Sequence, residues 1–377
     1  MKGVFTKSDL EALVSAGRIR KGRSFKQEHI GPASIDMTID LDHAYEVERI
    51  FRPRQQDGEK IADIIGQMGG VSLKNSRALN PKGEVMYPGR CYVAKASIEA
   101  NFSPGIYGYV NPKSTTGRNF LLTQLLADGM GWFDSIDKRS EGYKGELWVA
   151  FTPLVYPVLL SEEVCYNQLR IFDADTRFSR LSLEQLLQTQ DLLFRKSGVA
   201  YDQSELSLIS DDGSVITTLF ALGGEMVGYK AKKNAPPIDL TARNIDPSLY
   251  FEPVYAKYAT DGDKKSGYIE LEANTYYLLS TNEMLKVPEH LSAELRMLDP
   301  RLGLFFSHFA GFFDPGFFGT ATLEVMAPFD QCLRHKDPVA RFIFEELRGA
   351  TTSYAEKGSY QGQIETQLPK QFAAWKK

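Results

Sequence analysis

Cysteine is scarce in this sequence, and its few cysteines lie far apart. The 377 residues include only Cys91, Cys165 and Cys332, and no two of them form a CxxC pair. This spacing argues against a disulfide framework and against a cysteine-rich zinc site, and it is typical of a reducing compartment. We therefore expect a cytoplasmic protein that needs neither a disulfide nor a structural zinc ion.

Long hydrophobic runs are also missing. The longest, "LWVAFTPLVYPVLL" at residues 147–160, is too short to span a bilayer and contains two prolines. The N-terminal segment "MKGVFTKSDL" lacks the apolar core of a signal peptide. We expect neither a membrane segment nor secretion.

Charge of one sign does not dominate. The chain has 44 Lys and Arg residues against 48 Asp and Glu residues, which gives a net charge of −4. This balance gives no reason to expect nucleic acid or an acidic membrane as a partner. With 43% hydrophobic and 24% charged residues, the composition is that of a globular protein, and the length predicts two or three domains.

Helical periodicity is sparse, and most of the chain has the pattern of short strands separated by Gly, Pro, Asn and Asp turns. Only residues 7–19 and 179–198 have clear helical patterns. We place the domain boundary at the end of the second helix, which gives domains 1–197 and 198–377. The expected architecture is mainly β, with two barrels or sandwiches joined by a helix.

Two pairs of similar segments indicate an internal duplication. "PASIDMTI" at 32–39 resembles "APPIDLTA" at 235–242, and "GYKGELWVAFTPL" at 142–154 resembles "GFFGTATLEVMAPF" at 316–329. Both pairs occur in the same order, which favours duplication. The alternative is a chance similarity among short β-rich segments.

A single carboxylate stands out in the last of these segments. Asp314-Pro315-Gly316 has the composition of a tight turn. In the following "TATLEV", residues 320–325, polar and apolar residues alternate, so Glu324 lies on one face of a predicted strand and the apolar residues on the other. By itself, such a glutamate is normally a solvated surface group.

The order of four motifs resembles that of the bacterial dCTP deaminases. The motifs are "SDLEALVSAGRI" at 8–19, "GPASIDMTI" at 31–39, "KSTTGR" at 113–118, and the strand that follows a Gly-x-x-Gly turn. That family belongs to the dUTPase-like superfamily. The resemblance spans both halves and implies two tandem dUTPase-like distorted β-barrel domains with a few short helices.

The resemblance implies hydrolytic deamination of dCTP to dUTP and ammonia, a step in pyrimidine deoxynucleotide metabolism. Members of the family work without zinc, and Mg²⁺ is bound through the substrate triphosphate. Zinc-dependent deaminases use H-x-E and P-C-x-x-C ligand sets, and this sequence contains neither. We therefore expect a magnesium-bound substrate and no metal held by protein side chains.

The family's phosphate loop reads roughly Arg-Ser-Ser-x-x-Arg, and "KSTTGR" resembles it. Its cations and hydroxyls suit phosphate oxygens, and the candidates are Lys113, Ser114, Thr115 and Arg118. Lys113 replaces the bidentate fork of an arginine by a point charge. On spacing alone, an ordinary polar surface turn is the favoured interpretation of the segment.

The family segment "DPGWxGxxxLE" matches "DPGFFGTATLEV" without a gap, which implies that Glu324 is the catalytic acid/base. Arg301 or Arg296 would hold the carboxylate or stabilise developing charge. We expect burial against aromatic rings to raise the pKa of Glu324 toward neutrality, and the candidate rings are Phe312, Phe313, Phe317 and Phe318.

The resemblance also implies a lid at the C-terminus. The family closes over the triphosphate with a segment rich in Tyr, Lys and Gln. The matching residues in "SYAEKGSYQGQ" are Tyr354, Lys357, Tyr360, Gln361 and Gln363. An unstructured terminus would have a similar composition.

Each half lacks a different part of the family site. The first half has Ala150 where the glutamate should be, and the second has "RMLDPR", which keeps Arg296 and Arg301 but has Met297 and Leu298 in place of the hydroxyls. Since family sites form between subunits, we expect one composite site per duplicated chain, with the phosphate loop from one half and the glutamate and tail from the other. The alternatives are that neither half is active or that "RMLDPR" is misaligned.

Two other functions stay open. "SIDKRSEGYKGEL" resembles the dUTPase hairpin, in which Asp137 would orient water and Tyr143 would lie under the deoxyribose, although extra residues separate them. A dUTPase, or a bifunctional enzyme that converts dCTP to dUMP, is therefore the first alternative. A nucleotide-binding regulator without turnover is the second. We expect a homo-oligomer, and dTTP is a candidate inhibitor by family resemblance.

Overall fold

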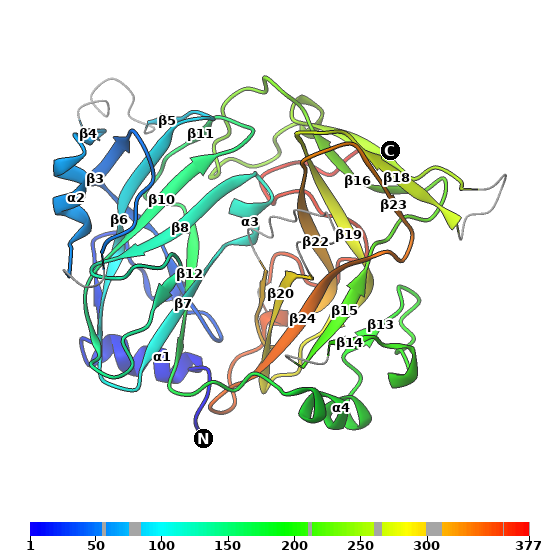
Figure 1. Ribbon diagram of the computed structural model, residues 1–377, viewed down its shortest axis with the longest axis horizontal. Coiled ribbons are helices and arrows are strands. Elements are labelled where there is room, and N and C mark those ends of the chain that lie inside the picture. Colours follow the sequence, from blue (N-terminus) through cyan, green and yellow to red (C-terminus); the bar gives the residue numbers. More distant parts are fainter. Residues whose placement is uncertain are drawn as a thin grey trace. The chain divides into compact units, whose positions relative to one another are not determined.

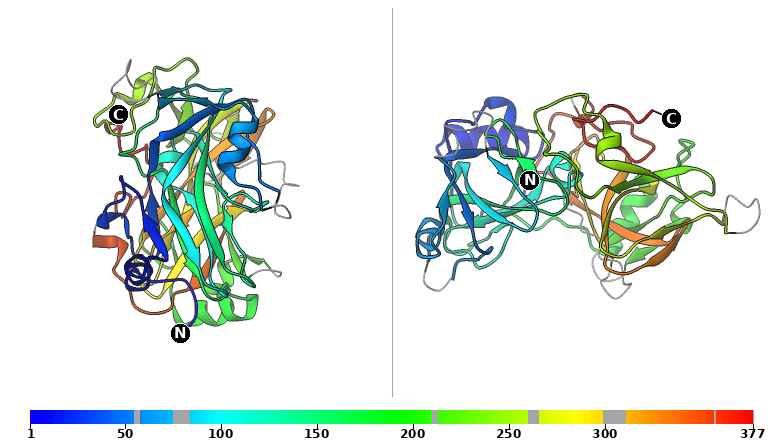
Figure 2. Two further views of the ribbon diagram at one scale, coloured as in Figure 1. Left: turned by 90° about the vertical axis from the view of Figure 1, so that its left-hand side faces the viewer. Right: turned by 90° about the horizontal axis from the view of Figure 1, so that it is seen from above.

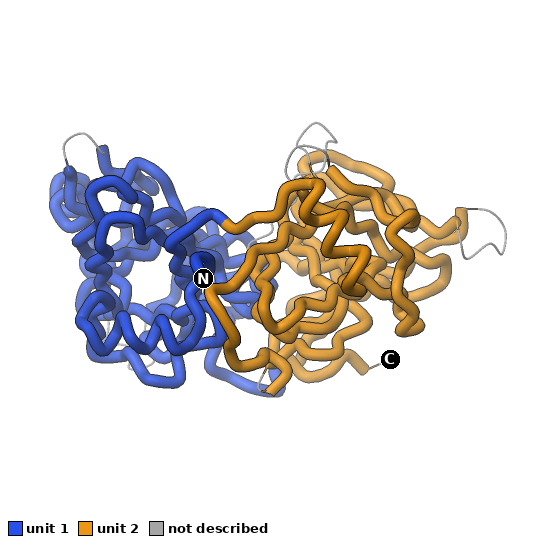
Figure 3. Tube along the Cα trace, turned by 90° about the horizontal axis from the view of Figure 1, so that it is seen from below, with its two compact units in different colours: residues 1–175, 234–245 blue, residues 176–233, 246–377 orange. Residues whose placement is uncertain are grey.

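The chain forms two compact units, coloured separately in Figure 3. Unit 1 contains Met1–Asp175 and Asn234–Ile245, and unit 2 contains Thr176–Lys233 and Asp246–Lys377. Each unit is therefore assembled from separate stretches of the chain. The computed structural model describes residues 1–54, 58–74, 84–209, 213–259, 266–298, 311–356 and 358–376.

The first stretch of unit 1 ends at residue 175, earlier than the expected boundary at 197. α4 (Arg180–Thr189) belongs to unit 2, because Leu183 lies in the hydrophobic core of that unit. β13 (Leu193–Phe194) pairs with β19 (Thr275–Lys286) of the same unit. The helix is therefore the first element of unit 2 and does not link two domains.

The segment 234–245 belongs to unit 1 although unit 2 flanks it in sequence. The N–H of Ile238 donates to the carbonyl oxygen of Pro157 at 2.8 Å, and its own carbonyl oxygen accepts from the N–H of Leu159 at 2.9 Å. These bonds attach the segment to β11 (Val158–Leu159), which pairs with β5 (Val85–Met86).

Unit 1 is built from antiparallel strands, labelled in Figure 1. One sheet has the order β4-β3-β6-β10-β8, with β1 also paired to β6, and another has the order β2-β12-β7-β9. α1 (Lys7–Ser15) precedes the first strand. The strands are β1 (Ile19–Lys21), β2 (Ile35–Met37), β3 (Ile39–Val47), β4 (Val71–Ser72), β6 (Cys91–Phe102), β7 (Tyr107–Pro112), β8 (Leu121–Ala127), β9 (Ser135–Ile136), β10 (Tyr143–Pro153) and β12 (Asn167–Phe172).

Unit 2 has the same kind of organisation. One sheet has the order β13-β19-β16-β17, with β22 also paired to β19, another has the order β14-β15-β24-β20-β21, and β18 pairs with β23. The remaining strands are β14 (Leu208–Ile209), β15 (Ser214–Thr218), β16 (Met226–Ala231), β17 (Phe251–Tyr255), β18 (Tyr268–Leu271), β20 (Leu291–Met297), β21 (Phe312–Phe313), β22 (Phe318–Ala327), β23 (Gln331–Arg334) and β24 (Pro338–Glu346).

The two units share one strand topology, so the predicted tandem β domains are confirmed. The sheet β2-β12-β7-β9 corresponds to β15-β24-β20-β21, and β3-β6-β10 corresponds to β16-β19-β22. The helix and strand at the start of each unit, α1 with β1 and α4 with β13, also correspond. The predicted match between 142–154 and 316–329 agrees with this topology, because β10 and β22 hold equivalent places.

The other sequence match joined the wrong segments. Residues 32–39 form β2 and the start of β3, and β2 pairs with β12. The strand in the equivalent place of unit 2 is β15, which pairs with β24. The true counterpart of 32–39 is therefore 213–219, "GSVITTL", whereas 235–242 belongs to unit 1. The shared Ile-Asp dipeptide suggested the wrong counterpart because a two-residue identity does not indicate with which strand a segment pairs.

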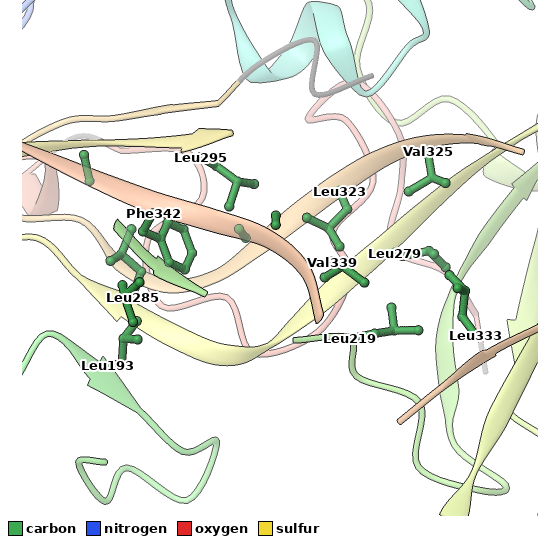
Figure 4. Packing of buried hydrophobic residues seen from close by; sticks show 14 of the residues in the cluster. Leu193, Leu219, Leu279, Leu285, Leu295, Leu323, Val325, Leu333, Val339 and Phe342 are labelled. Atoms are coloured by element: carbon green, nitrogen blue, oxygen red, sulfur yellow. The ribbon is translucent and has the colours of Figure 1, made fainter. Parts of the chain in front are cut away.

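The core of unit 2 contains side chains from both of its larger sheets (Figure 4). β19 contributes Leu279, β20 contributes Leu295, and β24 contributes Phe342. On β22, alternate residues enter the core, among them Leu323 and Val325. The period of two that the sequence predicted for this strand is therefore confirmed.

The helices in the described ranges are short, and none is long and apolar enough to cross a membrane. The three cysteines, all described, have free thiols: Cys91, Cys165 and Cys332. No covalent cross-link among them therefore contributes to the stability of either unit.

The carboxyl group of Asp134 supports the backbone just before β9, the strand that pairs with β7. Asp134 has φ 59°, its carbonyl oxygen accepts from the N–H of Val110 at 2.9 Å, and its Oδ1 accepts from the N–H of Leu125 at 2.6 Å. Burial raises the pKa of Asp134 to about 7. The folded chain therefore holds this proton at a pH where the unfolded chain has released it.

We predict that this group makes stability fall as pH rises. The pKa is about 7 when folded and 3.8 as the reference value, so the folded state binds more protons between these limits and loses stability as pH increases. Asp134→Asn keeps an acceptor for Leu125 and tolerates positive φ. Thermal unfolding at pH 5 and pH 8 should show a smaller decrease for the variant. Equal decreases for the two proteins would contradict the prediction.

Candidate active site

Glu324 lies on β22, just after the predicted turn. The turn is present: Gly316 has φ 83°, and the N–H of Phe317 donates to the carbonyl oxygen of Asp314 at 3.2 Å. Leu323 and Val325 enter the core, so the carboxylate lies on the opposite face of the strand. Its exposed fraction is 1%, so Glu324 is not the solvated surface group that its sequence position alone suggested.

Neighbours on the same sheet face are known from the strand register. Glu324 is opposite Leu278 on β19, and Leu278 is opposite Tyr229 on β16. Directly paired residues of antiparallel strands project to the same side. Figure 1 shows these three strands side by side. The carboxylate therefore belongs to a row with one aliphatic and one aromatic side chain.

Three of the aromatic rings predicted to surround this carboxylate have other neighbours. Phe317 belongs to the core of unit 2, and Phe313 packs against that core with its ring centroid 4.8 Å from that of Phe317. Both rings are on the side of β22 away from Glu324. Phe318 instead makes an edge contact with Phe194 at 5.6 Å. The prediction was wrong for Phe313 and Phe317, because the turn continues the alternation of the strand.

Two predicted phosphate-binding glutamines bind the backbone at the start of the strand that carries Glu324. The side chain of Gln361 accepts from the N–H of Phe318 at 3.1 Å and donates to the carbonyl oxygen of Gly316 at 3.2 Å. The side chain of Gln363 donates to the carbonyl oxygen of Thr320. Both amides therefore attach the C-terminal segment to β22, a role that composition alone could not show.

Of the other predicted tail residues, Tyr354 and Tyr360 pack against unit 2. The N–H of Tyr354 donates to the carbonyl oxygen of Pro315 at 2.7 Å, and its ring lies 5.8 Å from that of Phe317. Tyr360 is buried. Lys357 lies outside the described residues. The segment after β24 is therefore ordered against unit 2 over most of its length, unlike an unstructured terminus.

The predicted phosphate loop forms a short helical turn in unit 1. α3 (Ser114–Gly117) lies between β7 and β8, with Ser114 and Thr115 half-buried. Inside the turn, the side-chain amide of Asn119 donates to the carbonyl oxygen of Thr115 at 2.6 Å, and Arg118 is 4% exposed. Two hydroxyls and a buried guanidinium are thus held within one turn.

The first residue of the loop has a partner that the sequence analysis missed. Lys113 Nζ lies 2.7 Å from both carboxylate oxygens of Asp36, on β2. The aspartate belongs to the "SIDMT" motif, whose spacing gave no indication of this contact. Asp36 therefore offsets part of the positive charge of Lys113, and it also orients the ammonium group.

The equivalent of Glu324 in unit 1 is Ala150, as the sequence match predicted. In both units a tyrosine hydroxyl accepts from the backbone N–H five residues earlier: Tyr92 at 3.0 Å and Tyr277 at 2.8 Å. Ala150 pairs with Val93, the residue after Tyr92, and Glu324 pairs with Leu278, the residue after Tyr277. The two positions are therefore equivalent in the ladders.

In unit 1 the face that bears Ala150 is filled by apolar side chains. α2 (Ile61–Gln67) lies on the outer side of the sheet, as Figures 1 and 2 show. Its start is fixed by Asp128, whose Oδ1 accepts from the N–H of Ile61 at 2.9 Å. The cluster consists of Val47, Ile61, Ile65, Val93, Leu126, Trp148 and Ala150.

The dUTPase hairpin residues are engaged in local contacts. Arg139 Nε lies 2.9 Å from Asp137 Oδ1, and Arg139 Nη2 lies 2.8 Å from Asp137 Oδ2. Tyr143 is 3% exposed, and its hydroxyl donates to the carbonyl oxygen of Glu146 at 2.9 Å. An aspartate paired in this way is poorly placed to orient water, so the geometry does not favour the pyrophosphatase alternative.

The two arginines of "RMLDPR" do not supply a second phosphate loop in the described residues. Arg296 Nη2 lies 2.7 Å from Glu294 Oε2. The ladders of β20 and β7 give Arg296 the place of Asn111, two residues before Lys113, so the predicted alignment of this segment was shifted. Arg301 lies outside the described residues.

The predicted site residues thus divide between the units. The phosphate loop belongs to unit 1, and Glu324 with the tail belongs to unit 2. Joint action of the two groups stays a prediction. In the described part of the chain, no cluster of three or more His, Cys, Asp or Glu side chains is arranged to hold a metal ion.

We predict that restoring a glutamate in unit 1 destabilises the chain and adds no activity. In Ala150→Glu the new carboxylate enters the apolar cluster under α2, which should cost about 3 kcal/mol in the free energy of unfolding. Ala150→Gln is the control of equal size without charge. Urea unfolding measures the cost, and ammonia release from dCTP by Ala150→Glu in a Glu324→Gln background tests the activity. Recovered ammonia release would contradict the prediction.

Comparison with known proteins agrees with the resemblance found in the sequence. A model of the 2'-deoxycytidine 5'-triphosphate deaminase N-terminal domain matches residues 1–175, and a model of the C-terminal domain matches residues 182–372. The crystal structure of 2'-deoxycytidine 5'-triphosphate deaminase from Agrobacterium tumefaciens shares the fold, with a TM-score of 0.79 and 23% identity over 93% of this chain and 96% of that chain. The chain therefore belongs to the 2'-deoxycytidine 5'-triphosphate deaminase family and is an enzyme that deaminates dCTP.

Proposed function

We propose that Glu324 moves the protons in a zinc-independent hydrolysis of dCTP to dUTP and ammonia. One observation supports this assignment. The carboxylate of Glu324 is 1% exposed and lies on β22, the strand that follows the turn at Asp314-Pro315-Gly316, on the face opposite the core side chains of that strand. Titratable groups held in buried positions are concentrated at functional sites. Its position on a paired strand also holds it in one geometry.

The chemistry requires water to add at C4 of cytosine and the amino group to leave. Glu324 would take a proton from the attacking water and deliver it to N3, which gives a neutral tetrahedral adduct. The same carboxylate would then accept the proton of the new hydroxyl group and pass it to the amino nitrogen. Ammonia leaves, the carbonyl of uracil forms, and the proton on N3 is retained, so one water is consumed for each dCTP.

The triphosphate would bind at the turn of α3. Two hydroxyls and two cations gather there, and Lys113 is oriented by Asp36. Such donors suit phosphate oxygens. The two cations would repel a magnesium ion held by the protein alone, so the turn fits a substrate that brings its own magnesium ion. The ion would neutralise part of the triphosphate charge.

Assembly and inhibition follow from more general arguments. Closed homo-oligomers are the commonest assemblies of soluble enzymes, and we propose one here. dTTP carries the same deoxyribose triphosphate as dCTP, so the groups that bind dCTP would also bind dTTP as an inhibitor. Three free cysteines support a reducing location such as the cytoplasm.

The proposal predicts that Glu324→Gln abolishes deamination while dCTP still binds. Loss of the proton-transfer group should lower kcat about 1,000-fold. Glu346→Gln, an exposed carboxylate on β24, is the control and should keep full activity. Ammonia release and the dissociation constant of dCTP are measured on the same preparations. Deamination at the wild-type rate in Glu324→Gln would exclude the role given to this residue.

A second experiment separates deamination from pyrophosphate release. Since Asp137 is paired with Arg139, we expect no pyrophosphate from dCTP or dUTP, and Asp137→Asn should deaminate at the wild-type rate. Ammonia and pyrophosphate are followed together with Mg²⁺ present. Pyrophosphate from the wild type that disappears in Asp137→Asn would establish the bifunctional alternative. A thermal shift with dCTP and no product would establish the regulator.

A further inference from the structure

A histidine in unit 1 lies beside the ion pair of Lys113 with Asp36. Ile30 and Ile35 form an antiparallel bridge, and the next pair in the same register is His29 with Asp36. Side chains that are opposite each other on antiparallel segments are close neighbours. The imidazole of His29 therefore lies next to the carboxylate that Lys113 contacts.

One nitrogen of this imidazole is occupied and the other is available. The N–H of Lys26 donates to Nδ1 of His29 at 3.1 Å, so the hydrogen of the neutral ring is on Nε2. Among the residues that the structure describes, Nε2 has no acceptor. Both oxygens of the neighbouring Asp36 are instead 2.7 Å from Lys113 Nζ. The ring therefore keeps one donor for a ligand.

Burial keeps the ring of His29 neutral. The residue is 7% exposed, and its ring packs edge-on against that of Phe25, with 5.5 Å between the centroids. Burial lowers the pKa of His29 below its ordinary value of 6.5, although the carboxylate of Asp36 raises it. This influence of Asp36 agrees with the short separation that the register indicates. At neutral pH the imidazole is therefore an uncharged hydrogen-bond donor.

The neighbouring ion pair is accessible to a ligand. The side chains of Lys113 and Asp36 have exposed fractions of 31% and 23%. Lys113 directly precedes α3, in which Ser114 and Thr115 supply two hydroxyls. His29 therefore borders the turn at which the triphosphate is proposed to bind.

Unit 2 has none of these three side chains. The places of His29, Asp36 and Lys113 are taken there by Ser207, Ile216 and Leu298. The N–H of Ile216 still donates to the carbonyl oxygen of Ser207 at 2.8 Å, so the backbone pairing is kept. The histidine is thus absent together with the phosphate loop, which indicates a role in binding and not in the fold.

We propose that His29 is a further binding residue for dCTP and that its Nε2–H donates to a phosphate oxygen beside Lys113. The inference rests on the proposed binding of the triphosphate at α3. An uncharged donor binds the anion while Asp36 continues to orient Lys113, and hydrogen bonds to charged groups are stronger than those between neutral groups. The bond from Lys26 to Nδ1 fixes the direction of this donor. Deoxycytidine, which has no phosphate, would gain nothing from it.

The test uses two substitutions that each keep one half of the imidazole. In His29→Asn the amide oxygen replaces Nδ1 as the acceptor for Lys26, but no donor reaches the position of Nε2. In His29→Gln the amide nitrogen reaches that position. Calorimetric titration of the full chain in a Glu324→Gln background gives the dissociation constants of dCTP and deoxycytidine without turnover. We expect dCTP to bind about tenfold more weakly to His29→Asn, His29→Gln to restore most of this binding, and deoxycytidine to bind both equally well.

Ser114→Ala in the same background tests the proposed phosphate site itself, and it should weaken binding of dCTP but not of deoxycytidine. Unchanged binding of dCTP by His29→Asn would overturn the inference. Equal weakening for dCTP and deoxycytidine would also overturn it, because it would indicate a structural role. If Ser114→Ala weakens binding of dCTP and His29→Asn does not, the phosphate site stands and only the role of His29 is wrong. If Ser114→Ala has no effect, the proposed phosphate site is contradicted, and the titrations of the His29 variants still decide the role of the histidine.

Discussion

The pairing of β22 with β19 fixes the position of the proposed acid/base. Leu323 and Val325 enter the hydrophobic core of unit 2, so the residue between them must lie on the opposite face. A slip of one residue would put the carboxylate into the core and expose both aliphatic side chains, which makes the register strongly specified. The core therefore determines which face of β22 carries Glu324. The C-terminal segment binds β22 through Thr320, which lies on that same face.

The duplicated sheet uses this face in two different ways. In unit 1 the face carries Ala150 and Trp148 and is closed by α2 through an apolar cluster. In unit 2 it carries Glu324 and is approached by the polar C-terminal segment, through hydrogen bonds to the backbone. With the role proposed for Glu324, one scaffold serves packing in one copy and chemistry in the other, as expected when function is determined by a local site and not by the fold.

Local patterns in the sequence predicted local features well. The turn before β22, its alternation and the equivalence of Ala150 with Glu324 followed from short segments, because strand period and turn chemistry are local properties. Pairing partners distant in sequence were not predictable: the contact of Lys113 with Asp36, and the binding of the Gln361 and Gln363 amides to backbone groups. The match of 32–39 with 235–242 failed for the same reason, because two segments are structurally equivalent when they pair with equivalent strands, and residue identities alone do not show this.

The interleaved course of the chain has a consequence for its synthesis. Residues 234–245 complete unit 1 beside β11, yet they leave the ribosome after residues 176–233, which belong to unit 2. Unit 1 therefore cannot be completed before the first part of unit 2 has been synthesised, because β13 to β16 are released while unit 1 still lacks a segment. A gene fragment ending at codon 175 would encode a first unit without the stretch that bonds to Pro157 and Leu159.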